Sequence, residues 1–334
     1  MRTPLFTSIL ILIAAALYMA FRYLGNDYLF FAGYVVLQYI VIATAWNILG
    51  GYCGYVNFGS AGFFAIGVYC TIFFYNIGQS PGDVFPDFML TPMGWIFPLP
   101  LPILIVLGGF FAGLVGLGMG YLTLRLRGVF FAIATLALAV VLETFVVNWP
   151  FVGGSRGAYV IPPENIPVFG TFIQYLFVLM LLLVVLALAA ARLIERSRLG
   201  VGFATIRDDE LAAETCGVPT LRLKLVATAV SGALFGMAGA PFPFYIGYVE
   251  PNSAFNLSYA VNAIAMPMIG GTTTWIGPMI GALLLSTLQQ VVTVTISSAA
   301  NLLITGLLLI GFVILAPKGL VGLWQGWTGR SAKP

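Results

Sequence analysis

Ionised side chains are where a search for chemistry in this sequence begins, and most of the chain has few of them. The 334 residues contain 14 lysines and arginines, 11 aspartates and glutamates, and no histidine. Without histidine the chain cannot build a Ser-His-Asp triad, a histidine-ligated zinc or haem site, or an imidazole proton relay. Cys53, Cys70 and Cys216 form no CxxC pair, so we interpret them as small hydrophobic residues and expect no disulfide scaffold.

The densest group of charges lies between residues 192 and 224, which hold eleven of the 25 ionised side chains. Within this segment, Thr205 and Asp208 have the spacing of a capping box, and the two acids that follow favour a helix start. Gly217 supplies a left-handed stop, and Pro219 prevents the helix from resuming. The pattern predicts a helix of about ten residues, roughly 15 Å long. A short capped helix of this kind suits docking into a groove on a partner protein.

A metal or nucleotide site in this segment is weakly supported. Asp208 and Asp209 could be the start of an acidic metal-binding motif, but Ala212 stands where a third acid would be needed. A P-loop requires lysine directly after glycine, and none of the three lysines follows one. We therefore expect no metal site, no cofactor bound by this chain and no hydrolysis of ATP by this chain alone.

Two apolar stretches, at residues 50–62 and 266–278, are interrupted by glycine, proline and polar residues. Freed backbone groups at membrane depth are tolerated only inside protein or beside a water-filled path, and a matched pair of broken segments indicates a translocation site. Small residues at 109–113, 116–120 and 232–240 instead predict close packing between helices. Lining a path and capping a half-helix both remain open for the polar residues. The candidates from the two interrupted stretches are Asn57, Ser60, Gly270, Gly271 and Thr272.

Glu143 is a further path candidate, because it is the only acid well inside a predicted apolar span. It lies about six residues from one end of that span, or roughly 9 Å below it. Intramembrane carboxylates mark functional sites by default. The alternative is a partly solvated helix end, since Asn148 and Trp149 follow closely.

The elements that must position these residues are transmembrane helices. With 60% apolar and 7% charged residues, the chain is too hydrophobic for a single water-soluble core. At about 20 residues a crossing, it supplies roughly ten spans. We predict an all-α polytopic transmembrane bundle, with some spans broken or re-entrant. The predicted spans are 4–21, 29–49, 56–75, 98–124, 129–149, 171–191, 225–247, 258–275, 277–296 and 300–316.

The organisation expected is one transmembrane domain over residues 1–334, with a polar connection at 192–224 and a disordered tail at 326–334. The positive-inside tendency places both termini and the polar connection in the cytoplasm. A cleaved N-terminal signal peptide is the alternative and would leave nine spans. The basic residues used are Arg125, Arg127, Lys318, Arg330 and Lys333, and the acids expected on the other side are Asp83, Asp87, Glu164 and Glu250.

The segment Arg207-Asp-Asp-Glu-Leu-Ala-Ala-Glu214 resembles the cytoplasmic coupling region of branched-chain amino acid ABC transporter permeases, in their LivM-like branch. The similarity to that family includes residues 47–64, 125–136, 153–157, 200–217, 221–227 and 231–240, and it extends from about 45 to 320. The resemblance implies a protein of a bacterial inner membrane. Asn57-Phe-Gly departs from the Ser-Leu-Gly-His that is more common there, which puts the solute in doubt.

The resemblance implies the permease subunit of an ATP-driven importer for branched-chain or related amino acids and organic solutes. It also implies a second related permease, two cytoplasmic ATPase subunits that bind ATP and magnesium, and a periplasmic solute-binding protein. Two rival functions remain, an ion-coupled secondary transporter that uses Glu143 and an integral-membrane transferase. The residues that carry over as coupling residues are Ile206, Arg207, Asp208, Asp209, Glu210, Ala212, Ala213, Glu214 and Gly217.

Overall fold

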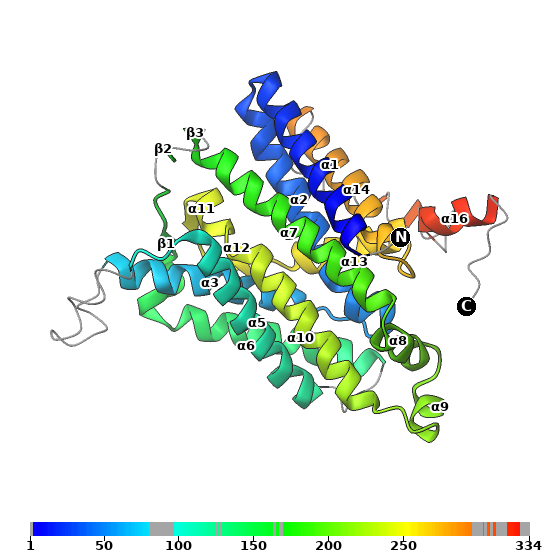
Figure 1. The fold of residues 1–334 in the computed structure, drawn as a ribbon. Helices are drawn as coiled ribbons and strands as arrows, with labels where there is room; N and C mark the ends of the chain where they lie inside the picture. Colours follow the sequence, from blue (N-terminus) through cyan, green and yellow to red (C-terminus); the bar gives the residue numbers. More distant parts are fainter. Residues whose placement is uncertain are drawn as a thin grey trace. The chain divides into compact units, whose positions relative to one another are not determined.

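The computed structural model describes most of the chain, and the described part is almost entirely helical (Figure 1). Of the residues used above for orientation, eight acids and bases lie outside the described part, as does most of the predicted span 300–316. They are Asp83, Asp87, Arg125, Arg127, Glu164, Lys318 and Arg330, together with Lys333 at the C-terminal end. The described residues are 3–79, 97–123, 126, 128–162, 165–166, 170–295, 303, 306–307, 310–311 and 319–327.

Eight helices among the described residues are long and apolar enough to cross a membrane. Their existence confirms the all-α polytopic class. The predicted span 258–275 is shorter than expected, because α13 covers only Leu257–Gly270 and contains Pro267. The candidate spans are Leu5–Leu24, Asp27–Tyr52, Ser60–Gln79, Leu101–Thr123, Val129–Val147, Phe172–Glu195, Thr220–Ile246 and Ile276–Thr295.

The chain divides into two compact units, and the first comprises Met1–Tyr55, Phe177–Ala227 and Val261–Pro334. In this unit α2 packs along α14, and nearly all of the second half of α2 is buried. The elements of this unit are α1 (Thr3–Leu24), α2 (Asp27–Asn47), a π-helical turn η1 (Ile48–Tyr52), α8 (Arg198–Asp208), α9 (Glu210–Thr215), α14 (Ile276–Thr295) and α16 (Gly319–Trp327).

The second unit comprises Val56–Leu176 and Thr228–Ala260. Its elements are α3 (Ser60–Gln79), α5 (Leu101–Thr123), α6 (Val129–Val147), the 3₁₀ turns η3 (Pro150–Val152) and η4 (Gly154–Arg156), β1 (Ala158–Tyr159), β2 (Asn165–Ile166), β3 (Gly170–Thr171), α11 (Phe242–Ile246), β4 (Tyr248–Val249) and α12 (Pro251–Ala254). Three helices contribute residues to both units: α7 (Phe172–Glu195), α10 (Thr220–Gly239) and α13.

Close backbone contacts between α3, α5 and α10 hold the second unit together. A Cβ atom added to Gly67 would lie 2.0 Å from the carbonyl oxygen of Gly236, and one added to Gly236 would lie 2.4 Å from that of Gly108. No side chain larger than hydrogen fits at these positions, so glycine permits the helices to pack backbone to backbone. The packing role predicted for the small residues of 232–240 is confirmed. The small strands form two antiparallel pairs, β1 with β4 and β2 with β3.

Candidate functional site

The first interrupted stretch begins where α2 changes into the π-helical turn η1. This wider turn brings Gly51 against the side chain of Asn47 and the backbone of Thr272. A Cβ atom on Gly51 would lie 1.9 Å from Asn47 Oδ1 and 2.7 Å from the Thr272 carbonyl oxygen. The chain then reverses at Gly54, whose φ of +80° favours glycine. The predicted interruption is confirmed, and it lies against the second one.

The second interrupted stretch is the turn between α13 and α14. Gly271 has a φ of +116°, and its N–H donates to the Pro267 carbonyl at 2.7 Å. A Cβ atom on Gly270 would lie 1.8 Å from the Gly277 carbonyl oxygen, so the backbone folds tightly on itself here. The path candidate Thr272 lies in the same turn. Residues 50–55 of the first stretch and the whole of the second thus form one region of irregular backbone within the first unit.

The charged connection after α7 contains two helices where the sequence predicted one. Thr205 lies inside α8 and donates to the Gly202 carbonyl at 2.8 Å, so it does not cap a helix. The true N-cap is Asp209, whose carboxylate accepts from the Ala212 N–H at 3.0 Å and starts α9. The capping-box prediction was wrong. Thr205 and Asp209 can both serve as an N-cap by sequence, but the helix that begins at Arg198 continues past Thr205, so only Asp209 starts a helix. The helix that begins at this cap, α9, is therefore six residues long and not about ten as predicted.

The predicted end of this helix is correct. Gly217 has a φ of +82°, and the Val218 N–H donates to the Ala213 carbonyl at 3.0 Å. This bond is the six-to-one contact of a Schellman motif, which needs the left-handed conformation that glycine provides. Among the coupling candidates, Ile206 and Ala213 are buried, whereas Ala212 and Glu214 are exposed. Leu211 is the large apolar residue that α9 presents outward, with 60% of its surface exposed.

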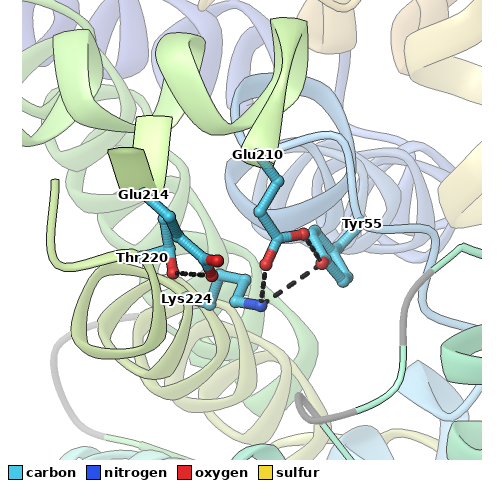
Figure 2. A network of polar contacts seen from close by, with 5 residues as sticks. All are labelled: Tyr55, Glu210, Glu214, Thr220 and Lys224. Carbon is cyan, nitrogen blue, oxygen red and sulfur yellow. Dashed lines mark hydrogen bonds and ion pairs between the residues drawn. The ribbon is translucent and has the colours of Figure 1, made fainter. Parts of the chain in front are cut away.

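A buried ion pair fixes α9 to the start of α10 and to the first interruption (Figure 2). Lys224 Nζ lies 2.6 Å from Glu210 Oε1, and the two side chains are only 3% and 13% exposed. The Tyr55 hydroxyl donates to Glu210 Oε2 and lies 3.3 Å from Lys224 Nζ. The Lys224 ammonium also lies 4.8 Å from the centre of the Tyr55 ring. A buried charge is tolerated only when it is paired and hydrogen-bonded, as these three groups are.

Two further contacts attach the charged connection to neighbouring backbone. Thr220 donates to Glu214 Oε1 at 2.8 Å, which links the end of α9 to the start of α10 (Figure 2). Arg207 Nη1 donates to the Gly51 carbonyl at 3.4 Å, and its Nε lies 3.3 Å from the exposed Asp208 carboxylate. Movement of α8 or α9 would therefore act on the first interruption through two separate groups of contacts.

Glu195, at the end of α7, contacts both interruptions. Its Oε2 atom accepts a hydrogen bond from the Trp275 backbone N–H at 2.8 Å, in the second interruption. The same oxygen accepts from the Tyr52 hydroxyl at 3.4 Å, in the first. One carboxylate thus holds the two irregular segments to the beginning of the charged connection.

The path candidates of the second unit make local contacts. Asn57 Oδ1 accepts from the Gly59 N–H at 2.8 Å, and the Ser60 hydroxyl lies 3.5 Å from the Asn57 carbonyl. Both contacts lie in the turn that leads into α3. Glu143 lines a pocket of about 410 Å³ together with two polar residues, Asn252 in α12 and Asn256 just after it.

Sequence reasoning missed Tyr55, Lys224 and Glu195 as members of the site. A signal for Lys224 was present, because a lysine near the start of an apolar span requires a partner. Tyr55 carried no such signal, since a tyrosine in a glycine-rich stretch is common in membrane helices. Burial raises the pKa of the Cys53 thiol, beside this network, to about 12, although Lys224 opposes the shift.

Comparison of the sequence with known proteins assigns the chain to a family. Residues 28–313 match the family described as branched-chain amino acid transport system / permease component. The high-affinity branched-chain amino acid transport system permease protein LivM of Escherichia coli is 27% identical over 315 residues, which cover 86% of this chain and 68% of that protein.

More distant relatives agree with this match. The probable branched-chain amino acid transport permease protein LivH of Methanocaldococcus jannaschii is 24% identical, over 68% of this chain and 75% of its own. The autoinducer 2 import system permease protein LsrC of Klebsiella pneumoniae is 30% identical over 40% of each chain. No solved structure matches. The family match over most of the sequence, together with the eight membrane-length helices, shows that this chain belongs to the branched-chain amino acid ABC transporter permeases and is a multi-pass membrane permease subunit.

Proposed function

We propose that this chain forms the translocation path of an ATP-driven importer that moves branched-chain amino acids, or related small amino acids and organic solutes, into the cytoplasm. The similarity to the LivM proteins supports this class of solute. The chain itself is not an enzyme in this proposal. It works with a second related permease, two cytoplasmic ATPase subunits that bind ATP and magnesium, and a periplasmic solute-binding protein.

The observation that carries the proposal is the buried network that joins α9 to the first interruption. In the proposed mechanism, closure of the ATPase pair displaces α9. Because Glu210 is held by Lys224 and Tyr55, this displacement reaches the residues that follow η1. Glu195 keeps the second interruption in step with the first. The irregular backbone around Gly51 and Thr272 then changes between two packed arrangements, as alternating access requires.

The energy source is the direct test of this function. The complex with its ATPase subunits is placed in proteoliposomes with the solute-binding protein, and uptake of labelled leucine is measured. We expect uptake that requires ATP and ignores proton and sodium gradients. Uptake driven by a gradient without ATP, and lost in Glu143→Gln, would instead establish the ion-coupled transporter that the pocket around Glu143 allows.

The proposal places α9 in the cytoplasm. Labelling of a native cysteine can test on which side of the membrane α9 lies. Cys216 is exposed at the end of α9, whereas Cys53 and Cys70 are buried. Since the thiolate is the reactive form, burial protects Cys53 twice: it shields the sulfur and raises the pKa of the thiol. A membrane-impermeant maleimide should label Cys216 in inverted vesicles and not in intact spheroplasts. Cys216→Ser is the control that removes the signal, and labelling from the periplasmic side would contradict the proposed orientation.

The outward face of α9 is the proposed docking surface for the ATPase, and Leu211 is its apolar centre. Because Ala213 is buried, a change there would test packing, so Leu211→Asp is the more specific variant. We expect it to reduce copurification of the ATPase subunits about tenfold or more, as loss of a buried apolar anchor does. The matched control is Ile161→Asp, a large apolar residue that is also exposed but belongs to the second unit. Equal recovery of ATPase with both variants would exclude this docking surface.

A further inference from the structure

The first unit contains an apolar groove of about 600 Å³ that is separate from the interrupted segments. Its walls are α1, α2, α7 and α14, which Figure 1 shows side by side. Along α1 the groove extends from Leu10 to Phe21, a distance of roughly 17 Å. One leaflet of a bilayer has a hydrocarbon thickness of roughly 15 Å. The groove therefore has the length of a single acyl chain in one leaflet.

The two ends of this groove differ in chemistry. At one end the rings of Phe21 and Phe177 lie 5.3 Å apart, and both residues line the groove. At the other end the lining residues of α1 and α7 are Leu10 and Leu188. Residues four positions apart share a helix face, so the same face of α7 continues to Arg192. The groove is thus apolar along its length and cationic beyond one end.

Arg192 lies about one turn of α7 beyond Leu188, the last residue of that helix to line the groove. Its guanidinium carbon lies 3.8 Å from the centre of the Phe6 ring and 5.7 Å from that of Trp275. Phe6 and Trp275 precede the groove residues Leu10 and Met279 by four positions each. One turn beyond the groove, three elements therefore converge on a single positive charge.

The guanidinium of Arg192 has an open hydrogen-bond donor although the residue is buried. The residue is only 5% exposed, and its Nε has no hydrogen-bond partner among the described residues. The carboxylate three residues along the helix, Glu195, accepts from Tyr52 and Trp275. A buried guanidinium with an open donor is favourable when it binds a phosphate or carboxylate oxygen.

We propose that this groove is a binding site for an anionic phospholipid, with one acyl chain between α1, α2, α7 and α14 and the phosphate on Arg192. An apolar helix from a partner protein would fill the groove but would supply no anion for Arg192. A free phosphate would pair with Arg192 but would leave the groove empty. A phospholipid satisfies both features, and the membrane that surrounds this multi-pass protein supplies it.

The binding test uses the full chain with its copurified partners, delipidated in detergent and analysed by native mass spectrometry. Three probes separate the two parts of the site: phosphatidylglycerol, diacylglycerol and glycerol phosphate. We expect phosphatidylglycerol to bind at least about tenfold more tightly than either of the others, because each lacks one half of the contacts. Equal retention of phosphatidylglycerol and diacylglycerol would overturn the proposal, as would a glycerol phosphate affinity equal to that of the lipid.

Matched variants assign the binding to these residues. Arg192→Gln should weaken phosphatidylglycerol binding about tenfold, and Arg192→Lys should retain most of it because the charge remains. Arg222→Gln removes an exposed arginine on α10 and should have no effect. Ala14→Trp fills the groove and should reduce binding of both phosphatidylglycerol and diacylglycerol. Ala16→Trp, exposed two residues along α1 and outside the groove, is its control.

Two results of the variant series would overturn the proposal. The first is unchanged phosphatidylglycerol binding in Arg192→Gln. The second is a cross-link from a photoreactive residue at position 14 to a companion subunit, with no phospholipid retained, because a protein helix would then occupy the groove. Melting temperatures measured without lipid show whether each variant is folded, so a binding defect in a folded variant is informative.

Discussion

Lys224→Met should uncouple the ATPase from transport and destabilise the first unit by about 3–5 kcal/mol, the usual cost of removing one partner from a buried ion pair. The Glu210 carboxylate would remain buried between α9 and α10 without its 2.6 Å ammonium partner. The Tyr55 hydroxyl alone cannot neutralise it. Because α9 would lose its attachment, we expect ATP hydrolysis by the complex to continue while leucine uptake falls to background. Thermal unfolding in detergent and uptake per ATP hydrolysed are the two measurements.

A double variant distinguishes loss of the ion pair from general damage. Lys224→Met combined with Glu210→Gln removes both charges, so most of the lost stability should return. The control pair is Thr220→Val with Glu214→Gln, which removes the neighbouring hydrogen bond of 2.8 Å without leaving a buried charge. That control should cost only about 1 kcal/mol. If Lys224→Met alone is no more destabilising than this control, the network does not hold α9 in the way the structure indicates.

The success and failure of the sequence predictions have physical reasons that particular residues illustrate. The apolar spans were predicted because a 20-residue run without charge leaves the backbone few alternatives to a helix. Gly217 was predicted as the helix stop because only the left-handed conformation completes a Schellman motif there. Both are local properties of the chain, so they can be predicted from neighbouring residues in the sequence.

The helix start and the buried network depend on packing and could not be read in the same way. Thr205 and Asp209 are both acceptable caps, and the choice between them follows from α8, whose Ile206 is buried and keeps the helix continuous past Thr205. Tyr55 and Glu210 are 155 residues apart in sequence, and no spacing rule connects them. The candidate site was thus located to the right segments, while the residues that join those segments required the fold.

Glu195 is the residue for which a single change should have the broadest effect on the moving parts. The second large effect we expect is that Glu195→Ala lowers the amount of leucine transported per ATP about tenfold, within the usual range of coupling free energies between two sites. The variant loses the acceptor for both the Trp275 N–H and the Tyr52 hydroxyl, so the two interruptions can move independently. ATPase stimulation should persist, because α9 and its ion pair are untouched.

Two comparisons isolate the contribution of each hydrogen bond. Tyr52→Phe removes only the contact to the first interruption, and because that bond is long, at 3.4 Å, its effect should be smaller than that of Glu195→Ala. Asp27→Ala removes an exposed carboxylate at the start of α2, away from the candidate site, and it should transport normally. Should folded Glu195→Ala transport as much leucine per ATP as Asp27→Ala, the two interruptions do not need the Glu195 carboxylate to move together. The path between them would then have to be opened by contacts within the glycine turns themselves, where Gly51 meets the backbone of Thr272.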